Sequence, residues 1–342
     1  MLACVGFPGA VLATDSDLLF ADDSTLNVRV VAPFVQIMRD RPTDDGGTNS
    51  DDPRGTLSLI EDDGSVVNFP IRIVTRGNNR RNVCGFTPLR FDFRKDELVD
   101  TVFEGQNKIK VVTHCRNRSK EYRQTVIREY LAYRILNILT DTSFRVRLMH
   151  ITYDFSDQKN KEEETFAFFI ENKNRFGERM NLDEQFIERI TVDSIDRAYL
   201  NLTSVFTYLI GNVDYSPVQG RKGERCCHNH TLFSADGDTF WSVPYDFDST
   251  GFVDAPHVEL SPNFKQSTIR QRIYRGRCHN QDLLPATLQI YKDKRADIEA
   301  LLEEQPELTN KVRKQLLRYV GRFFKLLEDE DQLIEDFAEA CI

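Results

Sequence analysis

Two aspartates alternate with aromatic residues where an apolar segment ends, in the run from residue 241 to residue 251. Asp246 and Asp248 lie in this run, and carboxylates placed in this way can bind a hard divalent cation. Asp214 lies upstream, directly after a strongly periodic helical pattern, and Asn229 lies between it and the aspartate pair. An Asp, an Asn and a second Asp in this order are the residue types that metal-assisted phosphoryl transfer uses. The pattern therefore predicts a metal site formed by Asn229, Asp246 and Asp248, with Asp214 beside it.

Each of these side chains also has a simpler interpretation. Asp246 and Asp248 are compatible with a solvated turn after a strand, in which the acids cap a following helix. Asp214 is compatible with a loop acid that ends a helix, and Asn229 with a turn amide. A metal-dependent hydrolase built on Asp246 and Asp248 is a further interpretation of the same residues.

The residue patterns predict the elements that must position these side chains. Alternation of apolar and polar residues predicts a hairpin at 55–60 and 66–75 around an Asp-Gly turn. Helical periodicity predicts a helix at about 123–139 and a second at 195–209, which leads into the Asp214 loop. Further strands are expected at 27–32 (or a short helix), 89–93, 108–113, 144–153, 165–170, 231–233 and 240–243, with helices beyond residue 280. This order indicates an α+β protein in two lobes.

Composition and charge exclude some classes of function. The 342-residue chain carries a net charge of -9, which argues against a general nucleic-acid binder with a clustered basic surface. No apolar stretch approaches the roughly 18 residues that a membrane span requires. Residues 41–53 contain almost no apolar side chain, which predicts a mobile loop.

The first thirteen residues carry no charged side chain and end in Val-Leu-Ala before an acidic stretch. This pattern is similar to the end of a secretory signal, so residues 1–13 are a candidate, truncated signal segment. A basic start to such a signal is missing because the first Lys or Arg is Arg29, and a merely apolar N-terminus is the alternative. We expect an exported protein, periplasmic or extracellular, rather than a cytoplasmic one.

The chain contains seven cysteines, enough for one to three disulfides in an oxidising compartment. Cys84 and Cys115 fall in neighbouring strand-like segments, and Cys226 or Cys227 could reach Cys278. Buried free thiols are the alternative interpretation. The run Cys-Cys-His-Asn-His from residue 226 also allows a structural zinc, although it lacks the spacer of a zinc knuckle.

Three stretches together resemble the spore-coat-protein-H (CotH) family. They are Thr-Arg-Gly-Asn-Asn-Arg-Arg at 75–81 followed by the basic strand at 88–93, the helix at 126–136, and the set Asn212-Val213-Asp214, Asn229 and Pro244-Tyr245-Asp246-Phe247-Asp248. The resemblance spans about residues 55–255. It implies an α+β, two-lobed protein-kinase-like fold, with a strand-rich N-terminal lobe carrying one helix at 20–172 and a mainly helical C-terminal lobe at 173–342.

The resemblance also implies roles for the polar residues in an atypical kinase-like phosphotransferase that uses ATP and Mg²⁺. Asp214 would accept the proton of an acceptor hydroxyl on a protein or another molecule, such as cell-envelope material. Asn229, Asp246 and Asp248 would hold the metal ion.

The implied ATP-binding residues lie in the strand-rich part. Lys110 and Arg90 are candidates for pairing with the phosphates, as is Lys108, and Glu129 could pair with Lys110 from the helix or lie exposed on it. Glu171 falls where a strand leads into the connector between the lobes. Arg76, Arg80 and Arg81 could also bind phosphate, but a charged hairpin tip is the simpler interpretation.

The chain departs from ordinary kinases at two points. Fourteen residues separate Asp214 from Asn229, where those enzymes have a much shorter spacing, and a glycine-rich phosphate loop is missing from the sequence. The alternative is a non-catalytic secreted pseudokinase that acts as a binding or structural protein of a cell envelope or coat.

Overall fold

The computed structural model describes residues 17–41, 54–77 and 80–342. The candidate signal segment at 1–13 lies outside the described residues, as do residues 42–53 of the loop predicted to be mobile.

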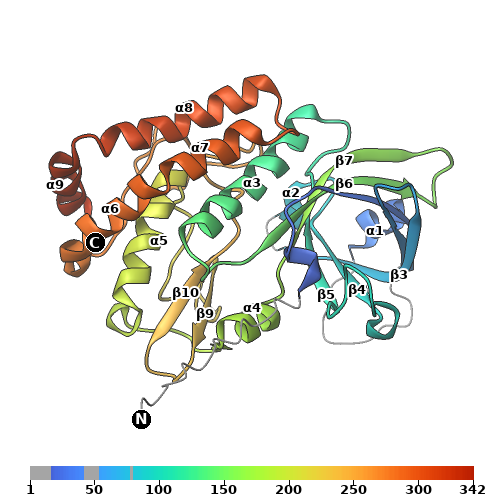
Figure 1. Ribbon diagram of the computed structural model, residues 1–342, viewed down its shortest axis with the longest axis horizontal. Coiled ribbons are helices and arrows are strands. Elements are labelled where there is room, and N and C mark those ends of the chain that lie inside the picture. The colour runs from blue at the N-terminus through green and yellow to red at the C-terminus, as the bar shows by residue number, and fades with distance from the viewer. Residues whose placement is uncertain (1–16, 42–53, 78–79) are drawn as a thin grey trace, which may run out of the picture.

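Seven strands form a closed barrel in the part of the chain that the structure describes (Figure 1). Neighbouring strands are antiparallel except β1 and β6, whose parallel pairing closes the barrel. The strands, in their order around the barrel, are β1 (Leu26–Ala32), β2 (Arg54–Ile60), β3 (Val66–Thr75), β4 (Leu89–Phe93), β5 (Lys108–Val112), β7 (Glu162–Ile170) and β6 (Val146–Phe155).

Aromatic side chains fill the barrel. Alternate residues of a strand point to the same side of the sheet, and Leu89, Phe91 and Phe93 of β4 are all buried. Phe93 stacks on Phe103, which in turn meets Phe169 of β7 edge to face. The short helix α1 (Phe34–Asp40) packs against β3 and β6, and the 3-10 turns η1 (Leu18–Phe20) and η2 (Lys95–Glu97) also belong to this part.

The helix α3 (Lys120–Leu139) lies between the barrel and the C-terminal helices (Figure 1). It begins at Ser119, whose hydroxyl accepts a hydrogen bond from the main-chain N–H of Tyr122. One side of α3 packs on β6 and β7, and another packs on α7 (Arg295–Glu304). Because both sides are covered, polar residues such as Glu129 are buried on this helix.

The part of the chain after residue 172 contains a second sheet and most of the helices. Its sheet has the order β10 (Phe240–Pro244), β9 (His230–Ser234) and β8 (Asp183–Glu184). Its other helices are α4 (Lys173–Met180), α5 (Arg197–Ile210), α6 (Leu284–Asp293), α8 (Asn310–Leu326) and α9 (Glu330–Ala340), with 3-10 turns η3 (Val192–Ser194) and η4 (Cys278–Leu283). The short helix α2 (Arg80–Val83) lies earlier, between β3 and β4. Within the described residues, no helix has both the length and the apolar character needed to cross a membrane.

The predicted two-lobed protein-kinase-like fold, with a strand-rich N-terminal lobe and a mainly helical C-terminal lobe, is wrong. The strands before residue 172 close into a barrel through the parallel pairing of β1 with β6, and the later part has a sheet of its own. Alternation of apolar and polar residues identifies a strand, but it does not reveal which strand lies on each of its two edges. The pairing that closes the barrel joins residues more than a hundred positions apart, such as Val28 and Ile151.

The individual strands and helices were predicted more accurately. The hairpin β2–β3, the strands β4, β5, β6 and β7, the helices α3 and α5 and the hairpin β9–β10 all lie within a few residues of their predicted positions. The segment at 27–32, left open between strand and helix, is β1.

Six cysteines form three pairs at disulfide distance among the described residues: Cys84–Cys115, Cys226–Cys227 and Cys278–Cys341. The pairing of Cys84 with Cys115 is confirmed. The expected pairing of Cys226 or Cys227 with Cys278 is wrong, because the chain end returns to η4, where the N–H of Ile342 donates to the main-chain oxygen of Gly276.

Close packing of β2 against β1 gives a stability prediction. A Cβ atom on Gly55 would lie 2.6 Å from the main-chain oxygen of Val31 and 2.9 Å from Cβ of Ala32. We therefore expect Gly55→Ala to lower the free energy of unfolding by about 1–3 kcal/mol in urea denaturation. Gly321→Ala in α8 is the matched control, since a Cβ there meets no atom within 4 Å, and it should stabilise by about 0.5–1 kcal/mol. Equal effects of the two substitutions would contradict the packing of β2 on β1.

Candidate functional site

One cavity of about 360 Å³ brings together most of the polar residues singled out in the sequence. It is bordered by the end of β3, the helix α2, the strand β5, the loop after α5 and the segment after β10. We call it the central cavity; its charged and amide side chains include Arg76, Arg80, Lys110, Asp214, Arg221, Glu224, His228, Asn229, Asp246 and Asp248. Asp214, Asn229, Asp246, Asp248 and Lys110 are thus brought together as the sequence predicted.

The β9–β10 hairpin places Asn229 and Asp246 at the same end of the second sheet. His230, the first residue of β9, pairs with Pro244, the last residue of β10. The next residue along, Tyr245, donates its main-chain N–H to the main-chain oxygen of Asn229 at 2.9 Å. Asn229 and Asp246 both have a positive φ, 54° and 65°, which Asn and Asp adopt more readily than most residues. The hairpin register therefore fixes the spacing of the two side chains.

Asp214 is positioned by the end of α5. Gly211 takes the left-handed conformation that ends this helix, with φ of 67°. Asn212 then accepts the main-chain N–H of Asp214 on its side-chain oxygen at 2.9 Å. The N–H of Gly251 donates to the main-chain oxygen of Gly211 at 3.1 Å. This last bond ties the Asp214 loop to the segment that carries Asp246 and Asp248.

Two neighbours hold Asp214 in place. His228 Nε2 donates to Asp214 Oδ1 at 2.8 Å, and Asn229 Nδ2 donates to the main-chain oxygen of Asp214 at 2.6 Å. The hydrogen bond from His228 lowers the pKa of Asp214, with a further contribution from the charge of Arg221. Asp214 is therefore ionised at neutral pH. Because the amide nitrogen of Asn229 is used by Asp214, its amide oxygen is the atom that could bind a cation.

The two aspartates after β10 have opposite electrostatic environments. Burial, followed by the charge of Asp248, raises the pKa of Asp246 to about 6. Burial also acts to raise the pKa of Asp248, but the hydrogen bond from His257 and the charge of Arg80 hold it below its ordinary value. His257 Nε2 lies 3.3 Å from Asp248 Oδ2. Asp248 is therefore the carboxyl that ionises more readily, and its negative charge makes the ionisation of Asp246 less favourable.

Glu129 reaches the same cluster from α3 and is 3% exposed. Burial raises its pKa well above the ordinary value, against the charge of Arg80. Arg80 Nη1 lies 3.6 Å from Glu129 Oε2, and Arg80 Nε lies 3.8 Å from Asp248 Oδ2. The sequence left two alternatives for Glu129, a pair with Lys110 or exposure on the helix; the residue is buried and its ion pair is with Arg80. The same guanidinium donates to the main-chain oxygen of Thr113 at 2.6 Å.

Lys110 lies on β5 with its ammonium group in the cavity wall. Burial, and then the charge of Arg76, lowers its pKa to about 7. Its Nζ lies 5.3 Å from the centre of the Tyr245 ring, which offers a cation–π contact. A further negative charge in the cavity would therefore favour the protonated form of Lys110.

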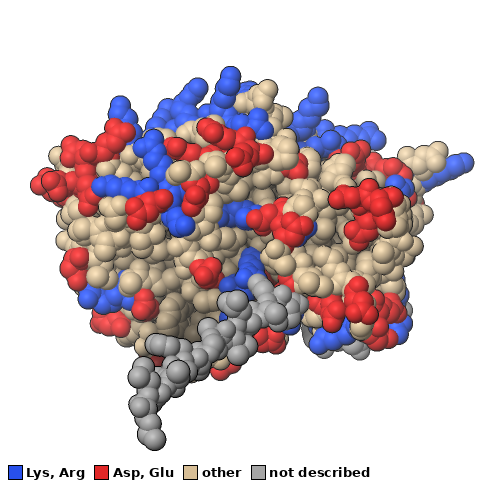
Figure 2. Space-filling model, viewed as in Figure 1, with Lys and Arg blue, Asp and Glu red and all other residues tan. Residues whose placement is uncertain are grey.

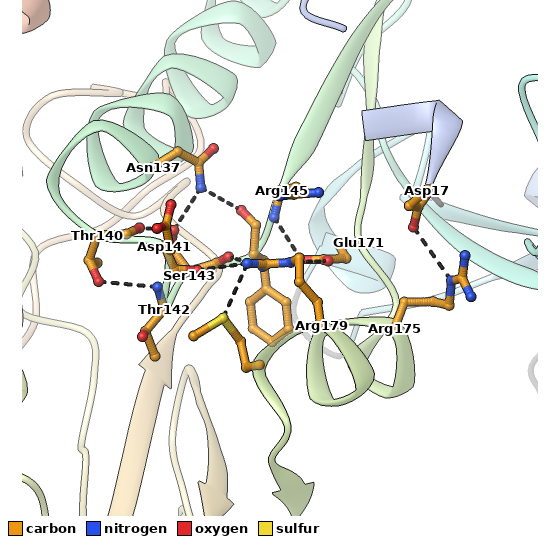
Figure 3. Close-up of polar contacts among 12 residues, drawn as sticks. Asp17, Asn137, Thr140, Asp141, Thr142, Ser143, Arg145, Glu171, Arg175 and Arg179 are labelled. Atoms are coloured by element: carbon orange, nitrogen blue, oxygen red, sulfur yellow. Dashed lines mark hydrogen bonds and ion pairs between the residues drawn. The ribbon is translucent and has the colours of Figure 1, made fainter. Parts of the chain in front are cut away.

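Arg90 and Glu171, two predicted ATP-binding residues, have other partners. The guanidinium of Arg90 on β4 binds Asp92, with Nε 2.6 Å from Oδ1, and Arg90 is not part of the central cavity's wall as the described residues form it. Figure 3 shows Glu171 held by Arg179, whose Nε and Nη2 both donate at 2.9 Å. The N–H of Arg145 donates to the same carboxylate at 3.0 Å. Glu171 therefore ties the segment before α4 to the last turn of that helix and to Arg145. It also borders a narrow pocket beside Lys110 and Asp246.

The sequence carries only weak signals for some residues of the site. For Arg76 and Arg80 it leaves phosphate binding open beside the simpler interpretation of a charged hairpin tip. Both residues line the central cavity, and the Nε of Arg76 donates to the main-chain oxygen of Leu89 at 3.2 Å. His228 stood out only as part of the Cys-Cys-His-Asn-His run. His257 gave no signal, because nothing in its local pattern links it to Asp248.

A second cavity, of about 540 Å³, adjoins the first at Asp214, Arg221, His228 and Ser249. The segment 257–263 forms its opposite wall, together with Val83 and Ile269. We call it the neighbouring cavity. Asp214 therefore borders both cavities. The central cavity is lined mainly by charged and amide residues, whereas the neighbouring cavity is lined by polar and apolar residues.

The side chains of the central cavity would hold a magnesium ion only together with oxygen atoms of a bound substrate. Among the residues that the structure describes, no group of three or more His, Cys, Asp or Glu side chains is arranged to hold a metal ion. Two carboxylates and an amide do line the cavity, and Mg²⁺ commonly binds through one or two carboxylates together with the phosphates of a substrate. The repulsion that raises the pKa of Asp246 would also be relieved by a divalent cation.

The chain matches no protein-family model and no curated protein. The resemblance to the CotH family therefore stays a prediction.

The raised pKa of Asp246 predicts a pH-dependent stability. A carboxyl whose pKa is about 6 in the folded protein binds its proton more tightly than in the unfolded chain, so the folded state loses stability as the pH rises from about 4 to about 6. Asp246→Asn should therefore be more stable than the wild type at about pH 8, by up to about 3 kcal/mol, and equal to it at about pH 4.

The measurement is urea denaturation at both pH values without added metal. Asp248→Asn is the matched control, because the pKa of Asp248 is lowered and its removal should destabilise the protein near neutral pH. A loss of stability for Asp246→Asn at high pH would contradict the burial of this carboxylate.

Proposed function

We propose that this protein is a phosphotransferase that uses ATP and Mg²⁺ to phosphorylate a hydroxyl group on a protein or another acceptor. The observation that carries the proposal is the convergence of Asp214, Asn229, Asp246 and Asp248 with four cationic side chains on one cavity of about 360 Å³. This volume lies within the usual range of small-molecule sites. The proposal rests on the site and not on the overall fold.

The cations of the central cavity suit the phosphate groups of a nucleotide. Arg76 and Arg80 present guanidinium groups, which match the geometry of phosphate oxygens. Lys110, with a pKa of about 7, would bind in its charged form once a phosphate lies beside it. The phosphates would also compete for Arg80, whose partners within the protein are Glu129 and Asp248 at 3.6 and 3.8 Å.

Asp246, Asp248 and the amide oxygen of Asn229 are the residues that would hold the magnesium ion. When bound, Mg²⁺ supplies charge neutralisation on the transferring phosphate group. The residues themselves contribute fixed positions: Asp246 is held by its main-chain N–H, which donates to the hydroxyl oxygen of Tyr133 at 2.8 Å, and Asn229 is held by Asp214. Preorganised ligands of this kind reduce the reorganisation needed for catalysis.

Asp214 would orient the acceptor hydroxyl and take its proton. Its Oδ1 accepts the shorter hydrogen bond, from His228 at 2.8 Å, and its Oδ2 accepts a longer one, from Asn229 Nδ2 at 3.3 Å. Oδ2 is therefore the less tightly bound oxygen and the one that would accept the proton. The neighbouring cavity reaches Asp214 from the side away from Lys110 and offers a route for the acceptor. Positioning the two reactants is the chief contribution that a protein makes to phosphoryl transfer, and Asp214 would position the acceptor.

We also propose that the protein works in an oxidising, exported location, periplasmic or extracellular. Three cysteine pairs at disulfide distance support this compartment. In the purified, unfolded but unreduced protein, alkylation should then label none of the six paired cysteines, and should label Cys4 only where residues 1–13 are retained. Labelling of several cysteines would argue against the proposed compartment.

Nucleotide binding is tested by thermal unfolding with and without ATP and Mg²⁺. A ligand at about a hundred times its dissociation constant stabilises the native state by about 2.7 kcal/mol, so the midpoint should rise by several degrees. Asp246→Asn should abolish most of this rise, whereas Arg90→Ala should keep it because Arg90 is bound to Asp92. An unchanged midpoint in the wild type with any nucleotide would refute ATP binding.

Phosphate transfer is tested separately with labelled ATP and a mixture of candidate acceptors. Asp214→Asn should keep the thermal shift and lose at least about a hundredfold in labelled phosphate incorporation.

One observation favours a second candidate, a non-catalytic binding or coat protein: Glu129 pairs with Arg80 instead of Lys110. Binding without incorporation in the wild type would establish that candidate in place of the enzyme.

A further inference from the structure

A row of exposed cations runs along the outer side of α8. Its members are Lys311, Lys314, Arg318, Arg322 and Lys325, spaced three or four residues apart, so they share one face of the helix. The opposite face is buried through Val312, Leu316, Val320 and Phe323. Figure 2 shows the corresponding Lys and Arg side chains along the upper edge of the molecule, over α8. We call this row the basic face.

The basic face lacks partners within the part of the chain that the structure describes. None of its five side chains makes an ion pair with a described residue, and α8 itself contains no acidic residue. Like charges at a spacing of three or four residues destabilise a helix. Five such charges on one helix face are therefore an unusual concentration of positive charge in a chain of net charge -9.

The next helix carries the opposite charge. Asp331, Glu335 and Glu339 of α9 are exposed and four residues apart, and α9 contains no basic residue. Among the described residues these three side chains make no ion pair, unlike Glu330, which binds Lys292. Acidic side chains gather at the end of the molecule where α9 lies (Figure 2). We call this row the acidic face.

We propose that the basic face of α8 in one molecule binds the acidic face of α9 in a second copy of the same chain. The two faces have complementary charge, and the basic face, about 21 Å long at 1.5 Å per residue, is long enough to cover the acidic face of about 12 Å. Leu326, which is 38% exposed, lies between them and supplies an apolar contact at the centre of the interface. Each copy offers both faces, so the contact can be made twice in a closed pair or repeated from copy to copy.

A second copy fits this surface better than a flat anionic surface or an acidic polymer. A flat anionic surface would contact the basic face of α8 and leave the acidic face of α9 without a partner. An acidic polymer would satisfy the basic face alone and leave the acidic face without a partner. Single surface ion pairs contribute little, so the association should be fast, weak and sensitive to salt.

The test is sedimentation velocity of the full chain at about 100 µM in about 50 mM and about 500 mM NaCl. The wild type should sediment faster than a monomer at low salt and as a monomer at high salt. Two charge-reversed variants, Lys314→Glu/Arg318→Glu/Arg322→Glu and Asp331→Lys/Glu335→Lys/Glu339→Lys, should each be monomeric at low salt. An equimolar mixture of the two should associate again, because their reversed faces are complementary.

The matched control is Lys95→Glu/Arg116→Glu/Lys159→Glu, which makes the same change in net charge as the reversal on α8 at exposed positions elsewhere. This control should associate like the wild type. A monomeric wild type at low salt, or a mixture of the two reversed variants that stays monomeric, would overturn the proposal. So would a monomeric wild type that binds heparin or vesicles of one-third phosphatidylglycerol through α8. Circular dichroism checks that each variant is folded, and the ATP-induced thermal shift is independent of this result.

Discussion

The structure depends on the mutual compensation of buried charges where the barrel meets the C-terminal part. Glu129 and the two aspartates after β10 face the guanidinium groups of Arg76 and Arg80 and the ammonium group of Lys110. A single buried charge of this kind costs several kcal/mol, and an ion pair offsets the cost only when its geometry is good. The ion-pair distances of Arg80, 3.6 and 3.8 Å, are longer than those of a tight pair. Arg80 therefore offsets the charges of these carboxylates only in part.

The sequence predicts the local part of this arrangement well. Alternation over 66–75 and 89–93 identifies β3 and β4, and periodicity identifies α3 and α5, because these patterns follow from the burial of one face of a local element. The order Asp214, Asn229 and Asp246 predicts a shared cavity, since the residue types are those that phosphoryl transfer uses. The prediction of the elements needs only the pattern of neighbouring residues. The prediction of a shared cavity needs only the chemical role of each residue type.

The remaining features depend on contacts between distant segments. The parallel pairing of β1 with β6 closes the barrel, yet nothing in the alternation of 26–32 distinguishes a strand at a sheet edge from one paired on both sides. Arg80 lies in a short basic run that is typical of an exposed tip, and only its approach to α3 makes it the partner of Glu129. Cys278 pairs with Cys341 because the last residues return to η4, and cysteine spacing does not encode such a return.

The error in the fold leaves the convergence of Asp214, Asn229 and Asp246 intact, because the two rest on different physical requirements. A fold is set by which strands share hydrogen bonds, whereas a site needs only a few side chains at fixed positions. The register of β9 and β10 and the end of α5 fix the positions of these three residues. They do so whether the strands before residue 172 form an open sheet or a closed barrel. The barrel contributes Lys110 through β5, and a side chain that alternates inward from a strand keeps its direction in either arrangement.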